Sequence, residues 1–380
     1  MRPLIAGRLQ PRHYLSMNTL VPMLPLVLAC ALIAAASPVV DEVAPAYEAI
    51  LKIDAHSHIF EDHPDFQALF QRNNVRTVNV CVIGTDSHLQ RMHSVAFDLY
   101  RRYPTLYPFV STFDLLKRDE PDYTKNVIAW LGETFAHGAV GVKVWKEVGL
   151  RIKRPDGSFA LPDDPFMDPI YAYVARQGKV LQIHSAEPIE AWLPLDKDSP
   201  HYDYFSKSPD RRFHGRSEYP SHAAIMAARD HIMEKHPTLV VLAAHLASLE
   251  HDLDGIARRL DQYPNFHVEV SSRTRDLTRH PSDRVRAFMF KYQDRLLYGV
   301  DQGWQPHLSR SVTEAQRAGA INLLELRYRI DYDYYAGSGE KTYDNRKVEA
   351  LHLPRRVLEK FYHENARRLF KLDAAWQGKP

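Results

Sequence analysis

The chain has 380 residues, of which 45% are hydrophobic, so it is long enough to bury one large core. Its 49 basic and 47 acidic residues leave a net charge of +2. This near balance gives no reason to expect nucleic acid or an acidic membrane surface as a partner. The 25 prolines outnumber the 16 glycines, which suggests long, stiffened loops.

The first 36 residues differ from the rest of the chain. A segment with three arginines precedes an apolar run over residues 20–36, which ends in three small alanines. Because these are the features of a signal peptide, we predict a leader over residues 1–36, with Met17 as a possible start. We expect a secreted or periplasmic protein without stable membrane insertion after cleavage. The alternative is an uncleaved membrane or lipid anchor, although Pro22 and Pro25 interrupt a run that is short for a span.

Short apolar runs typical of strands alternate with helical patterns from residue 48 to residue 375. In the first half of this region the predicted strands cover residues 51–59, 75–83, 107–113 and 139–145. The predicted helices cover residues 66–73, 87–103 and 122–137. After the fourth strand, residues 150–159 have the pattern of a hairpin with Asp156-Gly157 as its turn.

The second half continues the alternation. Strands are predicted at residues 179–183, 238–244, 265–270 and 295–299. Helices are predicted at residues 168–177, 223–235, 250–263, 282–292, 309–334 and 355–370. The stretch from residue 185 to 220 shows no periodicity and is predicted to be a long loop.

Eight strand–helix units predict an α/β fold, a (β/α)8 TIM barrel over residues 48–375 with loop insertions after strands 4 and 5. An open doubly wound sheet is the alternative. A nucleotide-binding sheet of that kind would normally show a glycine-rich turn between strand and helix, and this sequence has none.

Histidine and aspartate recur at the carboxyl ends of the predicted strands, where barrel active sites are built. His56 and His58 end the first strand, His184 and His245 follow the fifth and sixth, and Asp301 follows the eighth. With 20 histidines in the chain, roughly one H-x-H is expected by chance, so the pair alone carries little weight. The recurrence at later strand ends is what predicts a site for Zn²⁺ or a similar ion.

The sequence resembles the amidohydrolase superfamily, and specifically its amidohydrolase-related (type 2) branch of metal-dependent TIM-barrel hydrolases. The matching segments run through nearly the whole chain after the leader. They are IDAHSHIF (53–60), GVKVWK (141–146), LQIHSAEP (181–188), ARDHIMEKHPTLVVLAAHLAS (228–248), HVEVSSR (267–273), LLYGVDQ (296–302) and LPRRVLEKFYHENARRLFKL (353–372).

The resemblance implies that His56, His58, His184 and Asp301 bind a divalent metal, which we expect to be one zinc ion, with manganese or iron as alternatives. It implies that Asp301 also takes a proton from water and passes it to a leaving group. His245 is expected to orient or polarise the reacting carbonyl, although it is a ligand in relatives that hold two metals.

Further candidate residues leave alternatives open. Asp54 is either a metal ligand or a support behind the ligands. Lys143 is either a carboxylated bridge between two metals or an exposed or substrate-facing lysine, which we favour. Glu187 and Arg273 are candidate substrate contacts, with a surface loop and a surface ion pair as their respective alternatives. An aromatic lid is one interpretation of the loop after the fifth strand, and ordinary packing is the other; the residues are Trp192, His201, Tyr202, Tyr204 and Phe205.

The function predicted first is metal-dependent hydrolysis of an amide, ester or lactone carbonyl in a small molecule. The alternative is a metal-dependent decarboxylase of an unsaturated or aromatic acid, because relatives with that activity use the same ligands. A binding protein on an inactive barrel is a third hypothesis, but such a chain would be expected to have lost a ligand. The family also implies a possible homodimer.

Overall fold

The computed structural model describes residues 43–82, 86–304 and 313–372. The predicted leader, residues 1–36 with Met17, lies outside the described residues. Within those ranges, no helix combines the length and the apolar character needed to cross a lipid bilayer.

Nine strands form one sheet in the order β8-β7-β6-β5-β4-β3-β2-β1-β9, and each neighbouring pair runs parallel. β8 and β9 together occupy the eighth position of the ring, since β8 pairs with β7 and β9 pairs with β1. Between them, Asp301 N donates to His56 O at 2.7 Å. The strands are β1 Lys52–Ile59, β2 Val75–Val80, β3 Phe109–Ser111, β4 Gly141–Val144, β5 Val180–Ile183, β6 Val240–Ala243, β7 Phe266–Glu269, β8 Leu296–Leu297 and β9 Gln302–Trp304. The predicted (β/α)8 TIM barrel is therefore confirmed.

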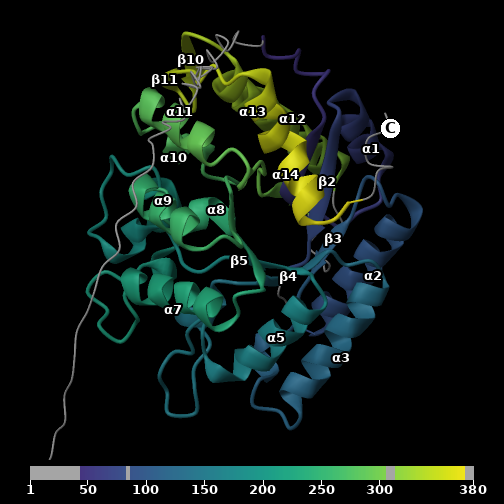
Figure 1. Ribbon diagram of the computed structural model, residues 1–380, viewed down its shortest axis with the longest axis vertical. Coiled ribbons are helices and arrows are strands. Elements are labelled where there is room, and N and C mark those ends of the chain that lie inside the picture. Colours follow the sequence, from purple (N-terminus) through teal and green to yellow (C-terminus); the bar gives the residue numbers. More distant parts are fainter. Residues whose placement is uncertain (1–42, 83–85, 305–312, 373–380) are drawn as a thin grey trace, which may run out of the picture. The chain divides into compact units, whose positions relative to one another are not determined.

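Helices connect successive strands and lie around them (Figure 1). The longer ones are α1 Pro64–Arg72, α2 Asp86–Arg102, α3 Tyr123–Ala136, α5 Asp168–Arg176, α7 His222–Lys235, α9 Leu253–Gln262, α11 Ser282–Lys291 and α12 Glu314–Ala336. The shorter ones are α4 Glu147–Leu150, α6 Tyr202–Lys207, α8 Ala244–Ala247, α10 Thr274–Leu277, α13 Arg355–Glu359 and α14 Asn365–Leu369. A π-helical turn, Lys360–Glu364, joins α13 to α14. The closing segment, predicted as one helix over residues 355–370, is therefore α-helical only at its two ends.

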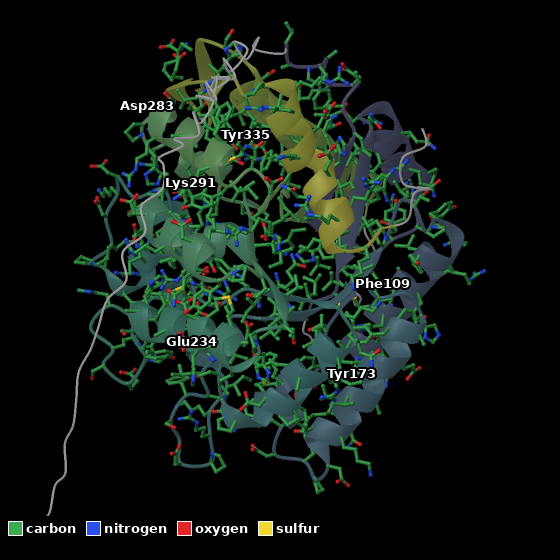
Figure 2. The ribbon with its side chains drawn as sticks, viewed as in Figure 1. Phe109, Tyr173, Glu234, Asp283, Lys291 and Tyr335 are labelled. Carbon is green, nitrogen blue, oxygen red and sulfur yellow. The ribbon has the colours of Figure 1, made fainter. Side chains whose placement is uncertain are left out.

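Apolar side chains fill both sides of the ring of strands. One cluster takes residues from several strands, including Ile53, Val78, Val110 and Leu242, as expected for side chains that face the barrel interior. Outside the ring the helices pack on one another through aromatic rings. Phe135 of α3 stacks on Tyr173 of α5 with 6.1 Å between ring centroids, and Figure 2 labels Tyr173. Burial on both faces explains why the strands appear in the sequence as short continuous apolar runs.

One of the two insertions agrees with its prediction and the other has more regular structure than predicted. The segment after β4 forms a single antiparallel bridge between Lys153 and Phe159, in line with the predicted hairpin. The stretch 185–220 was predicted to be a loop, but it contains helix α6 and two 3-10 turns, so that prediction was wrong. Its fold depends on burial of Phe205 and on Trp192, whose ring nitrogen donates to Pro220 O at 3.0 Å. The β10–β11 hairpin, Glu340–Tyr343 and Arg346–Glu349, was not predicted.

Candidate metal centre and active site

The structure brings the five strand-end residues together at one end of the barrel. His56 and His58 lie in β1, His184 follows β5, His245 follows β6, and Asp301 lies between β8 and β9. The imidazole centroids of His56 and His245 are 5.0 Å apart, and those of His184 and His245 are 4.2 Å apart. All four histidines are buried.

Asp301 is the carboxylate around which these imidazoles gather. Its Oδ1 lies 3.0 Å from Nε2 of His58 and 3.5 Å from Nε2 of His56, and its Oδ2 lies 4.0 Å from Nε2 of His245. Burial would raise the pKa of Asp301, but the neighbouring imidazoles hold it well below its usual value. Its side chain is 28% exposed, which makes it the most accessible member of the group.

Hydrogen bonds on the far side of three rings fix which nitrogen faces inward. Nδ1 of His58 donates to Val80 O at 2.7 Å, and Nδ1 of His245 donates to Ser271 O at 2.9 Å. Nδ1 of His56 donates to Glu269 at 2.8 Å. Each ring therefore presents an unprotonated Nε2 to the centre, which is the form that binds a metal.

These donors fit a divalent metal. One nitrogen each of His56 and His245 and one oxygen of Asp301 lie within 4.8 Å of one another. Among the described residues, buried Nε2 of His184 has no hydrogen-bond partner, and burial together with neighbouring positive charge holds its pKa well below the usual value. Neutral imidazoles and a carboxylate suit ions such as Zn²⁺, Fe²⁺ or Mn²⁺.

The backbone around His245 is left-handed over four consecutive residues, His245 to Ser248, with φ between 51° and 59°. Asp301 and Ser272 also have φ near 55°. For side chains with a Cβ this conformation costs about 1–2 kcal/mol per residue, and such strain is typically concentrated at functional sites. The tertiary hydrogen bonds of His245 hold this turn in place.

Three polar residues of the seventh strand and its extension support the centre, and none of them was predicted from the sequence as a site residue. Glu269 accepts from Nδ1 of His56 and from His245 N. Ser271 places its hydroxyl 3.0 Å from Nδ1 of His56, and Ser272 donates to Asp301 Oδ2 at 3.2 Å. Glu269 and Ser271 are two residues apart and share a strand face, which is the signal that could have identified the pair.

Asp54 is fully engaged by protein donors. Its Oδ1 accepts from His56 N and Val300 N at 3.0 and 3.1 Å, and its Oδ2 accepts from Ser57 Oγ and Tyr328 Oη. Burial raises the pKa of Asp54 to about 7 despite these hydrogen bonds. The geometry is that of a support that ties β1 to its neighbours, which was one of the two roles considered for it.

Lys143 is buried rather than exposed. Its Nζ lies 3.3 Å from Nε2 of His56 and 5.5 Å from the centroid of the Trp145 ring. Burial lowers the pKa of Lys143 to about 8. The side chain therefore borders the candidate metal centre. Its burial contradicts the exposed position considered for Lys143, while a substrate-facing role and a carboxylated bridge both stay predictions.

Glu187 and Arg273 are both buried, so neither is the surface residue that the alternatives described. Glu187 binds Lys146 at 2.6 Å and Arg211 at 3.0 Å, and these three charges line a hollow of about 210 Å³. Arg273 lies beside Glu250, with Nε 3.7 Å from its carboxylate. Of the aromatic residues after β5, Phe205 contacts the rings of His201 and Tyr204, and Trp192 contacts that of Phe213 at 4.9 Å between centroids.

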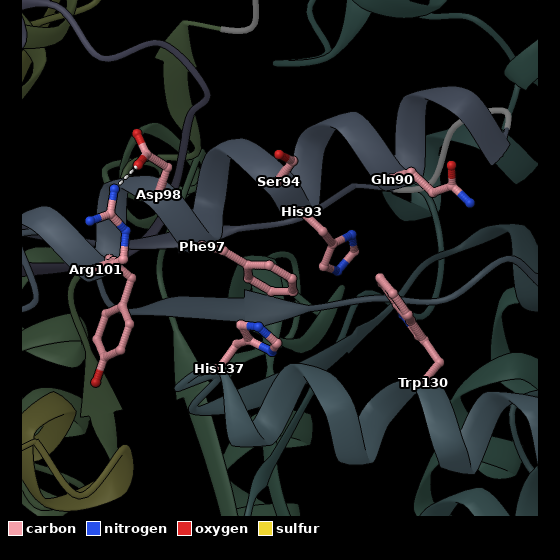
Figure 3. A pocket seen from close by; sticks show the side chains of 9 residues that line it. Gln90, His93, Ser94, Phe97, Asp98, Arg101, Trp130 and His137 are labelled. Carbon is pink, nitrogen blue, oxygen red and sulfur yellow. Dashed lines mark hydrogen bonds and ion pairs between the residues drawn. The ribbon is translucent and has the colours of Figure 1, made fainter.

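A wider hollow of about 700 Å³ lies between α2 and α3 (Figure 3). Its lining includes Phe97, Trp130 and His93. His93 is already satisfied, because its two ring nitrogens contact Leu89 O and Ser111 Oγ at 2.8 and 3.0 Å. The hollow belongs to the helical layer and not to the cluster of strand-end residues.

Comparisons with known proteins support the fold and show the family. No curated protein matches the chain by sequence. Among solved structures, the chain is similar to 2,6-dihydroxybenzoate decarboxylase from Rhizobium, at 15% identity and a TM-score of 0.50, covering 86% of this chain and 100% of that chain. It is also similar to a proposed amidohydrolase from Staphylococcus aureus, at 12% identity and a TM-score of 0.51, covering 85% of this chain and 100% of that chain. A family model described as amidohydrolase matches residues 87–372, a segment that holds His184, His245 and Asp301. The chain therefore belongs to the amidohydrolase family of enzymes.

Proposed function

We propose that the protein is a metal-dependent hydrolase that cleaves an amide, ester or lactone in a small molecule. The observation that carries this proposal is the position of Asp301, a partly exposed carboxylate in contact with His58 and close to His56 and His245. A carboxylate that faces a divalent cation stays ionised, so Asp301 would accept protons rather than donate them. Hydrolysis needs such an acceptor for the proton of the attacking water.

A divalent ion at this centre, most simply one zinc with manganese or iron as alternatives, supplies Lewis acidity that acidifies water and polarises a carbonyl oxygen. Asp301 then accepts the proton of the attacking water and delivers it to the leaving group. His56 and His58 hold their Nε2 atoms toward the centre through Glu269 and Val80. Nε2 of His245 is likewise an acceptor, so the geometry favours His245 as a ligand over a donor to the carbonyl.

A second candidate is metal-dependent decarboxylation of an unsaturated or aromatic acid. Buried Lys143, 3.3 Å from Nε2 of His56, favours it because an ammonium at the centre can bind a substrate carboxylate. The similar Rhizobium structure is named as a decarboxylase, which agrees with this candidate without deciding between the two. Decarboxylation requires protonation of carbon, and an ionised Asp301 is poorly suited to donate that proton.

The test compares the metal-loaded protein with its Asp301→Asn variant on a panel of esters, lactones, amides and hydroxybenzoic acids. We expect hydrolysis without CO₂ release, and a loss of about 10²–10⁴-fold in the variant, as for removal of a general base. Asp163→Asn, at a carboxylate paired with His231, is the control. Release of CO₂ without hydrolysis would establish the second candidate, and full activity of Asp301→Asn would refute the role of Asp301.

We also propose that the enzyme acts outside the cytoplasm, after removal of residues 1–36. The basic segment and apolar run of the sequence support this proposal. Mass spectrometry of the protein from fractionated cells would show a mature chain that begins near residue 37. An intact leader on cytoplasmic protein would contradict it.

A further inference from the structure

A second group of metal-ligating side chains lies in the loops that follow β5, β6 and β7. Glu190 and His201 belong to the insertion after β5, Glu250 follows the left-handed turn after β6, and Asp276 lies in α10. One donor atom each of Glu190, His201 and Glu250 lie within 4.8 Å of one another. None of these residues is a donor of the catalytic centre described above.

Several donor atoms of this group are buried and make no hydrogen bond. His201 and Glu250 are each only 2% exposed. Among the described residues, both carboxylate oxygens of Glu250, Nε2 of His201 and Oε2 of Glu190 have no hydrogen-bond partner. Buried carboxylates normally accept hydrogen bonds or coordinate a metal, so several buried donor atoms without a hydrogen bond at one place point to a ligand.

The neighbouring charged side chains do not supply the missing hydrogen bonds. Arg273 Nε lies 3.7 Å from Glu250 Oε1, too far for a hydrogen bond, and its Nη1 donates to Ser272 O instead. Nε2 of His201 lies 3.1 Å from Asp276 Oδ1 and 3.8 Å from Glu250 Oε1. Two ligands about 2.1 Å from one ion in a tetrahedron lie about 3.4 Å apart, so these distances match a ligand shell.

We propose that Glu190, His201 and Glu250, completed by Asp276, bind a structural divalent metal ion. One imidazole nitrogen with carboxylate oxygens is a donor set that suits zinc or manganese. The ion fastens the insertion after β5 to the loops after β6 and β7. It thereby holds the segment that carries Glu187 at the mouth of the barrel. This role is independent of which reaction the catalytic centre performs.

The test separates the two centres by variants. A chain with His58→Ala and Asp301→Ala, which lacks two catalytic donors, is dialysed against zinc and then manganese, and its bound metal is measured by elemental analysis. When His201→Gln and Glu250→Gln are added to this chain, we expect its metal content to fall by one ion per chain. His231→Gln, at an exposed histidine–carboxylate pair, is the matched control and should change nothing.

Two further measurements on the wild-type chain test the proposal even if the variants do not fold. Crystals of the wild-type chain soaked in manganese should show an anomalous scattering peak between His201 and Glu250. Chelation should accelerate proteolysis of the insertion, residues 185–220, by about tenfold or more, because local opening is then less costly. The proposal is overturned if the wild-type crystals show no peak there, or if the added substitutions leave the metal content of a folded chain unchanged.

Discussion

The support of His56 by Glu269 gives the most direct test of how the metal centre is held. Glu269 is fully buried and accepts from His56 Nδ1 at 2.8 Å and from His245 N at 3.2 Å. Burial would raise its pKa, but His56, which donates a hydrogen bond to it, and nearby His245 and Lys143 lower the pKa to about 2, so the residue is ionised. The substitution Glu269→Gln removes the charge. It also places an amide NH₂, which is a donor, beside groups that themselves donate to Glu269, such as His56 Nδ1 and His245 N.

A hydrogen bond to a charged group contributes about 1.5–3 kcal/mol, which corresponds to roughly 10–100-fold in an equilibrium constant. Loss of an outer hydrogen bond to a ligating histidine typically weakens metal binding by the same factor. We therefore expect Glu269→Gln to weaken zinc affinity by about 10–100-fold.

Competition with a chromogenic chelator measures this affinity. Glu234→Gln, at an exposed glutamate that accepts from Tyr263 Oη at 2.8 Å, is the matched control (Figure 2). Circular dichroism checks that both variants are folded. A folded Glu269→Gln protein whose zinc affinity lies within about twofold of wild type would refute the role given to Glu269.

Three further predictions concern residues around the centre. Tyr328→Phe removes the hydroxyl that donates to Asp54 at 2.8 Å, and it should lower the free energy of unfolding by about 1–3 kcal/mol in urea titrations. Burial raises the pKa of Asp331 from 3.8 to about 6, so the native state binds this proton more tightly than the unfolded state. The free energy of unfolding should therefore decrease as the pH rises from 4 to 6, by at most about 3 kcal/mol through this group. In Asp331→Asn the free energy of unfolding should depend less on pH over this range. An unchanged slope in urea titrations across this range would count against the assignment. Lys143→Met should retain metal but lower kcat/KM by about 10–100-fold if the ammonium contacts substrate. A loss of metal instead would identify Lys143 as a bridging ligand.

The strands were predictable because their side chains are buried on both faces, which leaves short apolar runs between helical patterns. Because His184, His245 and Asp301 follow the carboxyl ends of those runs, the sequence predicted that they lie at the same end of the barrel. The β10–β11 hairpin was not predictable in this way, because its exposed positions, such as Glu340 and Arg346, give no apolar alternation. Helix α6 was missed for a related reason, since a six-residue helix has little local preference and depends on burial of Phe205.

The conformation of His245 could not be read from local sequence. Left-handed backbone is expected at glycine or asparagine, and the segment His245-Leu246-Ala247-Ser248 contains neither. Contacts with residues distant in sequence stabilise it, since Glu269 accepts from His245 N and Ser271 O accepts from His245 Nδ1. The contact to Ser271 O also sets the tautomer of the ring, so the seventh strand and its extension hold both the strained backbone and the ring of His245.

Asp54 shows where a correct pattern led to an incomplete expectation. Asp54 lies two and four residues before His56 and His58, a spacing that puts all three side chains on one face of a regular strand, but the pairing of β1 with β2 shifts register between Asp54 and Ser57. The carboxylate instead accepts from His56 N in β1 and from Val300 N, one residue before Asp301. A single buried side chain thus joins the first strand to the eighth, at the point where the ring closes and where both supply donors. Asp54 is therefore best understood as the residue that sets the distance between His56 and Asp301.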